Sequence, residues 1–299
     1  MFEASVVIPV KNREKTVLRA IESVKNQRDV HLQIIVVDDG STDNTVKNIQ
    51  KQHPQIVIVH NKISQGAAKA RNKGATMAKF DYICFLDSDD TWESDHITKS
   101  ISFIIDNNCD GSFSQFNNII GANFQAINFD KDKTLNILEN ILNETTFDCR
   151  TSTFVFKKEA FLDIKFDESL KKYQDWDIAF RFSKKYTFCL NRVNTVNLFM
   201  EEENRMSNSN NIEALKYFFN KHSNSISDNS KLIFLVKSLK YLQSNQLREK
   251  EIVRQLIRKI DSNLLNGRNK IIFFLVSYKI LSPYHIYKLF KIYHSIYSI

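Results

Sequence analysis

The sequence predicts an α/β fold: a mostly parallel sheet with helices on both faces, followed by a C-terminal α-helical extension. The first observation behind this prediction is that short β-branched runs alternate with segments of helical periodicity over residues 5–90. Such alternation is typical of βαβ units that build a parallel sheet. The second observation is that residues 212–299 keep the apolar spacing of helices throughout.

Polar residues are expected at the ends of the predicted strands. The strands are expected at residues 5–10, 31–37, 56–59 and 81–86, and the helices between them at 13–27, 42–52 and 66–79. Residues 31–37 are almost continuously apolar, which suits a strand buried on both faces. Polar segments follow three strands, at 11–13, 38–41 and 87–90. Because ligands bind at the carboxyl ends of parallel strands, these segments are expected to line one site.

The rest of the chain suggests a boundary near residue 207. Helices are expected near 97–105 and 176–185, and strands near 111–118, 152–156 and 188–199. The polar segment 200–211 is typical of a loop. A chain of 299 residues can form one large domain and a smaller extension. We therefore expect a catalytic domain at 1–207 and a basic α-helical region at 208–299.

Charge and cysteine content bear on location. The net charge is +8, and residues 231–299 carry 13 basic and 3 acidic side chains. No signal peptide is expected, and the apolar run between Lys270 and Lys279 is shorter than the roughly 20 residues of a spanning helix. The four cysteines are widely spaced without a CxxC pair. This spacing favours neither a zinc site nor disulfides and fits a reducing, cytoplasmic location.

Asp87, Ser88 and Asp89 follow an apolar strand and are candidates for metal binding. Two carboxylates one residue apart cannot both be buried there without a partner. A divalent cation would compensate their charge, and carboxylates suit Mg²⁺ or Mn²⁺, which also take oxygens from substrate phosphates. The alternative is a solvated acidic turn that caps the next helix. The triplet alone does not choose between them.

Two other segments could contact a nucleotide. Asp39 lies in the turn after a buried strand, where it could accept hydrogen bonds from a base or ribose, or only cap the turn. Lys69 and Arg71 lie in an Ala-rich helix after Gly66. They could face a diphosphate, to which arginine gives bidentate contacts, or form a solvated helix face.

Asp175 lies at the start of a predicted helix, between Gln174 and Trp176. One interpretation makes it a helix N-cap. The other makes it a general base beside a tryptophan platform for a sugar, because an ionised carboxylate can accept a proton from an attacking hydroxyl. The histidines show no metal-binding spacing, and no GxSxG, P-loop or GxGxxG motif is present.

Together these segments resemble glycosyltransferase family 2, an inverting family of nucleotide-sugar transferases with the GT-A fold, a Rossmann-like α/β fold. The matching stretches are 5–12, 34–43, 66–74, 82–90, 166–168 and 174–177. The resemblance covers residues 4–207. Lys11 replaces the usual aromatic residue and Gln174 the acidic residue that often precedes the base. No QxxRW motif is present, so transfer of one or a few sugars is expected rather than processive synthesis.

The resemblance implies a role for each matching position. The residues implied to bind the nucleotide sugar are Pro9, Val10, Asn12, Asp39, Arg71, Asp87, Ser88 and Asp89. Asp89 and Asp87 form the family's DXD motif, with Asp89 the direct ligand of Mn²⁺ or Mg²⁺. Asp175 matches the catalytic base, with Gln174 and Trp176 on the acceptor side. Arg205 and Ser207 match a loop that closes on the diphosphate.

These roles imply an inverting, metal-dependent transfer from a UDP-sugar to a hydroxyl of a surface glycan, free or lipid-linked. Two other functions remain open: a nucleotidyltransferase, which would release pyrophosphate, and a non-catalytic nucleotide- or glycan-binding protein. The basic helices either pack together, within the chain or in a homo-oligomer, or lie on an anionic membrane surface. For residues 269–299 we expect membrane contact, since aromatic and basic residues alternate there. No nucleic-acid-binding module is recognised.

Overall fold

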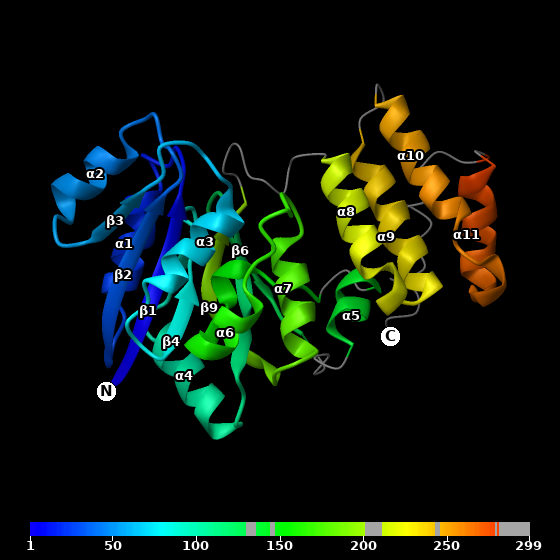
Figure 1. The fold of residues 1–299 in the computed structure, drawn as a ribbon. Helices are drawn as coiled ribbons and strands as arrows, with labels where there is room; N and C mark the ends of the chain where they lie inside the picture. The colour runs from blue at the N-terminus through cyan, green and yellow to red at the C-terminus, as the bar shows by residue number, and fades with distance from the viewer. Residues whose placement is uncertain (130–135, 144–146, 201–210, 243–245, 279, 281–299) are drawn as a thin grey trace. The chain divides into compact units, whose positions relative to one another are not determined.

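The structure is a computed structural model, which describes residues 1–129, 136–143, 147–200, 211–242, 246–278 and 280. The chain divides into two compact units, drawn in Figure 1. Unit 1 comprises Met1–Ile137 and Thr145–Ser207, and unit 2 comprises Leu138–Glu144 and Asn208–Ile299. The short insertion Leu138–Glu144 thus groups with the C-terminal part of the chain, although we expected it within the first domain.

Unit 1 is built on one mixed sheet. Within the described residues its strands are β1 (Phe2–Val10), β2 (Val30–Asp38), β3 (Val57–His60), β4 (Tyr82–Phe85), β5 (Thr91–Trp92), β6 (Gly111–Ile120), β7 (Asn123–Ile127), β8 (Val155–Lys157) and β9 (Phe188–Phe199). The strand order is β3-β2-β1-β4-β8-β6-β9-β5, with β7 paired to β6. β1, β2, β3 and β4 are mutually parallel, and β8 runs antiparallel to β4 and β6. The predicted mostly parallel sheet is confirmed.

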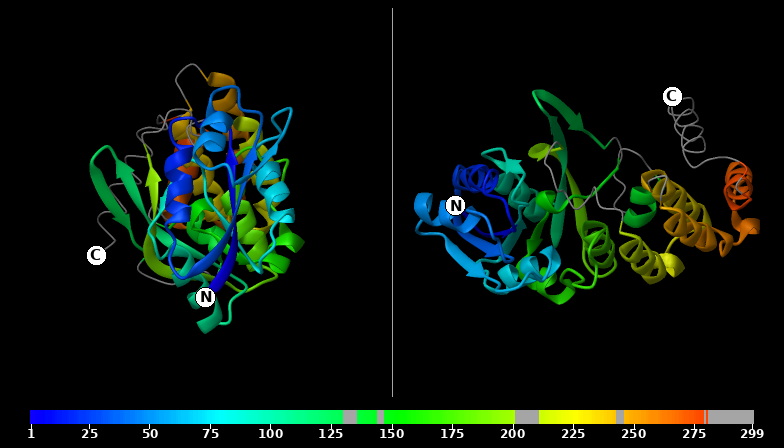
Figure 2. Two further views of the ribbon diagram at one scale, coloured as in Figure 1. Left: turned by 90° about the vertical axis from the view of Figure 1, so that its left-hand side faces the viewer. Right: turned by 90° about the horizontal axis from the view of Figure 1, so that it is seen from above.

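Helices cover both faces of this sheet, as predicted. The helices of unit 1 are α1 (Val17–Lys25), α2 (Thr45–Gln52), α3 (Ala67–Thr76), α4 (His96–Asp106), α6 (Lys158–Ile164) and α7 (Gln174–Ser183). In the left view of Figure 2, α1 and α3 lie on opposite faces of the parallel strands. This placement follows from right-handed crossovers, because α1 leads outward from β1 to β2 whereas α3 leads back from β3 to β4.

Helix α3 packs very closely on the centre of the sheet. A Cβ atom added at Gly74 would lie 2.4 Å from Cγ1 of Val7 on β1 and 3.0 Å from Cγ2 of Val37 on β2. Only glycine therefore fits at this position without displacing buried β-branched side chains. The close contact fixes the height of α3, and with it the position of the buried Arg71 one turn earlier in the helix.

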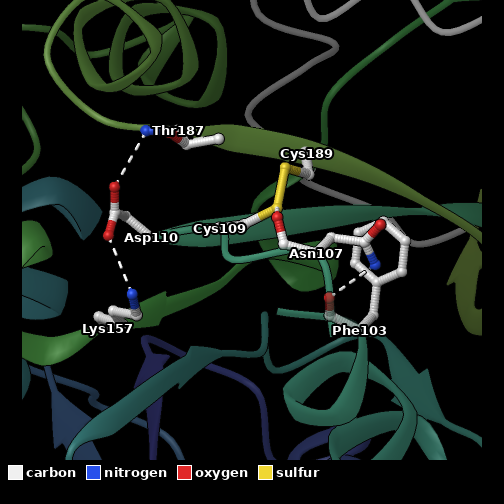
Figure 3. Close-up of a disulfide and its surroundings, with 7 residues drawn as sticks. All are labelled: Phe103, Asn107, Cys109, Asp110, Lys157, Thr187 and Cys189. Atoms are coloured by element: carbon white, nitrogen blue, oxygen red, sulfur yellow. Dashed lines mark hydrogen bonds and ion pairs between the residues drawn. A yellow bond between two sulfur atoms is a disulfide. The ribbon is translucent and has the colours of Figure 1, made fainter. Parts of the chain in front are cut away.

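The cysteine expectation was wrong. Cys109 and Cys189 form a disulfide across 80 residues of sequence (Figure 3). Cys109 lies just before β6 and Cys189 lies on β9, and these strands pair in parallel with Ser112 opposite Cys189. Spacing in the sequence could not reveal this pair, because the pairing of β6 with β9 brings the two cysteines together. Cys84 and Cys149 are free and buried.

The region between β6 and β9 differs in detail from the prediction. Thr151–Thr153 form a short 3-10 turn, so the strand expected at 152–156 begins only at Val155. This turn matters for the site, because it places the polar side chain of Ser152 below the end of β4. The strand predicted at 188–199 is confirmed as β9.

Unit 2 is helical. Its helices are α5 (Ile137–Asn143), α8 (Ile212–His222), α9 (Asp228–Tyr241), α10 (Leu247–Arg258) and α11 (Gly267–Ser277). The Glu139 carboxylate on α5 accepts hydrogen bonds from the Ser227 backbone and the Ser230 hydroxyl at the start of α9. These bonds explain why the insertion groups with the C-terminal helices. None of the helices among the described residues is long and apolar enough to span a bilayer.

Candidate active site

The predicted polar segments meet at the carboxyl edge of the parallel strands. Val10 at the end of β1 lies opposite Asp38 at the end of β2, and β4 runs alongside β1 in the same direction. Asn12 has a left-handed backbone, and its side-chain oxygen accepts a hydrogen bond from the Thr42 backbone at 2.8 Å. Pro9 and Val10 are buried. The ends of β1 and β2 are therefore tied together at the site.

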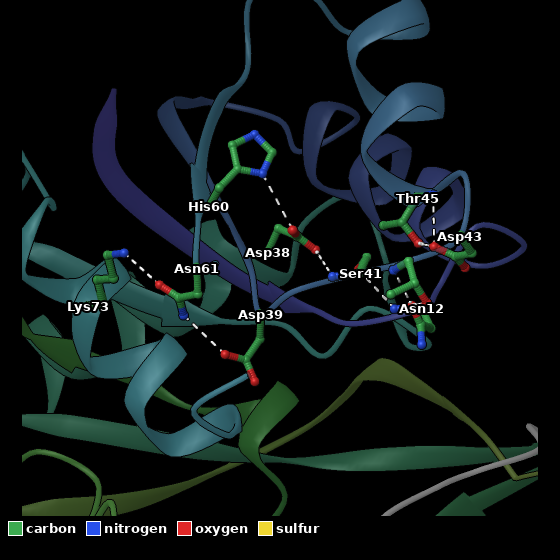
Figure 4. A network of polar contacts seen from close by, with 10 residues as sticks. Asn12, Asp38, Asp39, Ser41, Asp43, Thr45, His60, Asn61 and Lys73 are labelled. Carbon is green, nitrogen blue, oxygen red and sulfur yellow. Dashed lines mark hydrogen bonds and ion pairs between the residues drawn. The ribbon is translucent and has the colours of Figure 1, made fainter. Parts of the chain in front are cut away.

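Asp39 organises the loop that follows β3 (Figure 4). Its carboxylate accepts hydrogen bonds from Asn61 (3.0 Å), Ser64 (2.7 Å) and the backbone N–H groups of Gln65 and Gly66 (both 2.8 Å). Burial acts to raise the pKa of Asp39, but these four bonds outweigh it and the pKa is lowered. The bonds use the usual acceptor capacity of a carboxylate, so Asp39 is ionised and holds the loop after β3 in place.

Arg71 connects two segments that are far apart in the sequence. It is only 4% exposed, which excludes the solvated helix face for this residue, while Lys69 is exposed. Its Nη2 donates to Oδ1 of Asp87 at 2.5 Å and its Nη1 donates to Oε1 of Gln174 at 2.7 Å. Gln174 in turn donates to the Leu170 carbonyl at 2.6 Å. One guanidinium thus joins the end of β4 to the first residue of α7.

Most of the acidic segment after β4 is buried. Ser88, Asp89 and Asp90 are 6%, 7% and 2% exposed, and the residue that precedes helix α4 is Asp95. Oδ2 of Asp89 lies 3.9 Å from Nη2 of Arg13. Asp87, the first residue of the triplet, keeps 33% of its side chain exposed, so burial argues against a solvated turn at Ser88 and Asp89 only.

Ser152 anchors the turn after β4. The Ser152 hydroxyl donates to Oδ2 of Asp90 at 2.7 Å and accepts from the Asp87 backbone N–H at 3.1 Å. This geometry holds the acidic segment in place beneath the end of β4.

Asp87 and Asp89 could together bind a divalent cation that also binds the phosphates of a substrate. No group of three metal-ligating side chains occurs among the residues that the structure describes. Mg²⁺ at phosphate sites commonly uses one or two carboxylates and completes its shell with phosphate and water oxygens. Asp89 and Asp87 supply that number of hard oxygen ligands, although Oδ1 of Asp87 is bound to Arg71. The metal site stays a prediction.

Asp175 lies in the first turn of α7. The N-cap of this helix is Tyr173, with a left-handed φ of 65°, and Asp175 is the second helical residue, so the N-cap interpretation of Asp175 is wrong. Burial raises the pKa of Asp175 to about 6. The positive charges of Arg150 and Arg71 act to lower this pKa, and the negative charge of Asp148 acts to raise it. A carboxylate with this pKa is mostly ionised at neutral pH and is a stronger base than an exposed aspartate.

The acceptor-side residues differ in their surroundings. Gln174 is buried and its amide is used by Arg71 and the Leu170 carbonyl, so in this structure its side chain supports Arg71. Nε1 of Trp176 donates to Oδ1 of Asp148 at 2.8 Å. Arg205 and Ser207 lie outside the described residues.

Sequence reasoning missed the segment 147–153. Asp148 bonds Trp176, Arg150 forms an ion pair with Asp148 at 2.6 Å, and Ser152 holds Asp90. The signal was a polar run, Asp-Cys-Arg-Thr-Ser, directly before an apolar strand, but the antiparallel direction of β8 could not be inferred from it.

Comparison with known proteins decides the family. The profile of glycosyl transferase family 2 matches residues 5–164. The chain belongs to glycosyl transferase family 2. The family profile covers most of β1, all of β2, β3 and β4, and the acidic triplet, and it ends before the helix of Asp175.

Curated relatives of this family 2 chain are bacterial glycosyltransferases. The amylovoran biosynthesis glycosyltransferase AmsB of Erwinia amylovora is 32% identical over 60% of this chain and 64% of its own length. The putative teichuronic acid biosynthesis glycosyltransferase TuaG of Bacillus subtilis is 36% identical over 38% of this chain and 46% of its own length. The UDP-Glc:alpha-D-GlcNAc-diphosphoundecaprenol beta-1,3-glucosyltransferase WfgD of Escherichia coli is 31% identical over 54% of this chain and 68% of its own length. The matches thus span less than two thirds of the first two relatives.

The fold matches that of a solved structure, S. aureus TarS. Residues 1–349 of S. aureus TarS in complex with UDP-GlcNAc superpose with a TM-score of 0.70 at 18% identity, covering 97% of this chain and 92% of that one. At 18% sequence identity, this match is evidence for the fold alone. The predicted GT-A fold is confirmed.

Proposed function

We propose that this chain is an inverting, metal-dependent glycosyltransferase that transfers a sugar from a UDP-sugar to a hydroxyl of a surface-glycan acceptor. The observation that carries the proposal is the Arg71 bridge, which joins Asp87 of the acidic triplet to Gln174 beside the base Asp175. The bridge assembles, from segments about ninety residues apart, a donor side and a base side of one site. The family membership and the UDP-GlcNAc complex of TarS support a nucleotide-sugar donor.

The transfer is a single displacement at the anomeric carbon. Asp175 accepts the proton of the acceptor hydroxyl while the hydroxyl oxygen forms a bond to the anomeric carbon, and the bond from that carbon to the diphosphate breaks on the opposite face. Arg71 keeps Asp87 and the first turn of α7 in register, so that donor and base are aligned before reaction. A divalent ion held by Asp89 and Asp87 would offset charge on the leaving diphosphate. The configuration at the anomeric carbon inverts.

The acceptor is proposed from the named relatives. AmsB and TuaG are named for biosynthesis of surface polysaccharides, and WfgD for transfer to a sugar on diphosphoundecaprenol. By analogy with WfgD, whose name gives both a UDP-sugar donor and a diphosphoundecaprenol acceptor, the acceptor proposed here is a growing glycan on a lipid diphosphate.

Helix α11 is proposed to bring the protein to an anionic membrane surface. Ile271, Phe274 and Tyr278 are exposed along one stripe of this helix, with exposed Lys270 beside them. The rings of Phe274 and Tyr278 lie 4.6 Å apart. An apolar aromatic stripe flanked by lysine suits the boundary between acyl chains and anionic headgroups. Residues 281–299, which continue the predicted membrane segment, lie outside the described residues.

The test is a panel of nucleotide sugars incubated with purified protein, with Mn²⁺, with Mg²⁺ and with a chelator. The proposal expects release of a nucleoside diphosphate from one donor class, and stimulation of that release by metal. Release of pyrophosphate from a nucleoside triphosphate would identify a nucleotidyltransferase instead. Binding of a donor without turnover under every metal condition would identify a binding protein.

A further inference from the structure

Asp148 divides its carboxylate between two side chains from different parts of the chain. Oδ1 accepts from Nε1 of Trp176 on α7 at 2.8 Å, and Oδ2 lies 2.6 Å from Nη2 of Arg150. Asp148 itself is mostly buried, with 19% of its side chain exposed. A charged acceptor makes the stronger class of hydrogen bond, so one carboxylate fixes both an indole ring and a guanidinium.

Both partners of Asp148 are linked to the proposed base, Trp176 by its neighbouring position and Arg150 by its charge. Trp176 follows Asp175 in α7, and its backbone N–H donates to Oδ1 of Asp175 at 3.2 Å. Arg150 lies among carboxylates: Asp148 raises its pKa most, and Asp175 and Asp90 act in the same direction. The charged groups that act on Asp175 are therefore Arg150 and Arg71 on the positive side, and Asp148 and Asp87 on the negative side.

We propose that Asp148 is a positioning residue of the acceptor subsite, which holds the Trp176 ring as a platform for the acceptor sugar and holds Arg150 beside Asp175. The inference rests on the proposed function and deepens it. The apolar C–H face of a sugar ring packs on an indole face, and the hydroxyls at the ring edge stay free for polar contacts. A sugar on Trp176 would present a hydroxyl to the adjacent residue, Asp175, and the ring can hold this pose only if the indole cannot swing away.

Variants of Asp148 separate its two contacts. Asp148→Asn keeps an oxygen that can accept from Trp176 but loses the ion pair with Arg150, whereas Asp148→Ala loses both. Trp176→Phe keeps an aromatic ring but cannot donate a hydrogen bond. Asp110→Asn is the matched control, because Asp110 pairs with Lys157 at 3.0 Å and accepts from the Thr187 backbone N–H at 3.1 Å (Figure 3), and neither partner belongs to the site.

The kinetic experiment uses the full chain, a UDP-sugar donor from the panel and a GlcNAc diphosphate that carries a short synthetic lipid. Asp148→Ala is expected to raise the acceptor KM about tenfold, the effect of losing one hydrogen bond of about 1.4 kcal/mol, with the donor Kd unchanged. Trp176→Phe should raise the acceptor KM to a similar extent, and the double variant should raise it no further than Asp148→Ala alone, because the two replacements share the loss of the Asp148–Trp176 hydrogen bond. Asp148→Asn should lower kcat more than it raises the acceptor KM.

A second measurement does not depend on turnover. The chain has 2 tryptophans, so the two indole N–H signals of ¹⁵N-tryptophan-labelled protein report on Trp92 and Trp176 separately. Asp148→Ala should move the Trp176 signal and leave that of Trp92, which donates to the Ser152 carbonyl at 2.7 Å. An unmoved Trp176 signal, or additive effects on the acceptor KM, would overturn the inference. Absence of transfer by the unmodified protein would instead count against the proposed function, and the indole signals would still test Asp148.

Discussion

Replacing the Asp175 carboxylate by an amide is expected to stabilise the fold while it abolishes transfer. Burial raises the pKa of Asp175 from 3.8 to about 6. A carboxylate whose pKa is higher in the folded than in the unfolded protein destabilises the fold when it ionises. The penalty is therefore complete above about pH 6 and is lost as the pH falls toward 3.8. At about 1.4 kcal/mol per pKa unit, ionisation of Asp175 lowers the free energy of unfolding by about 3 kcal/mol at pH 8, and by about half of that at pH 5.

Urea unfolding of the protein without metal or nucleotide measures this penalty. Asp175→Asn should be more stable than the unmodified chain at pH 8, and the gain should shrink by about half at pH 5. Asp81→Asn is the control, because Asp81 is exposed and its replacement makes the same change in net charge. If Asp175→Asn gained no more than Asp81→Asn, or gained equally at both pH values, burial would not be what sets the basicity of Asp175.

Three further predictions concern packing, redox state and membrane contact. Gly74→Ala should lower the free energy of unfolding by about 1–3 kcal/mol, because the added Cβ meets Val7 at 2.4 Å; an unchanged urea midpoint would contradict this. Peptide mapping without reductant should find the disulfide, and Cys109→Ser should lower the thermal midpoint, because opening an 80-residue loop costs up to about 4.5 kcal/mol in the chain-entropy model. The double replacement of Phe274 and Tyr278 by serine should weaken binding to anionic vesicles at low salt and leave donor turnover in solution unchanged. If vesicle binding is unchanged and light scattering instead shows loss of a dimer, the stripe serves self-association.

The sequence was informative wherever periodicity and strand direction decide the structure. The alternating pattern of residues 5–90 predicted β1 to β4 and their parallel direction, and this shared direction brings Asn12, Asp39 and Asp87 to one edge of the sheet. Parallel strands need long crossovers, and the helical spacing of these crossovers is visible in the sequence.

The remaining parts of the site depend on contacts that no local pattern records. Arg71 was expected at a diphosphate, yet its guanidinium is held by Asp87 and Gln174, and this follows from the approach of α3 to the sheet at Gly74. The polar run that contains Asp148 did not show that this residue belongs to the site, because the antiparallel pairing of β8 with β4 and β6 sets its position.

The most direct test of the central claim compares Asp175→Asn with the unmodified protein in donor binding and in sugar transfer. The amide keeps the size of the side chain but cannot accept the proton of an attacking hydroxyl. The account predicts that UDP-sugar binds with unchanged Kd while transfer to the acceptor falls by at least about a hundredfold, within the usual effect of a general base. Full transfer by Asp175→Asn would contradict the account, because the site would then lack the base on which the proposed mechanism depends.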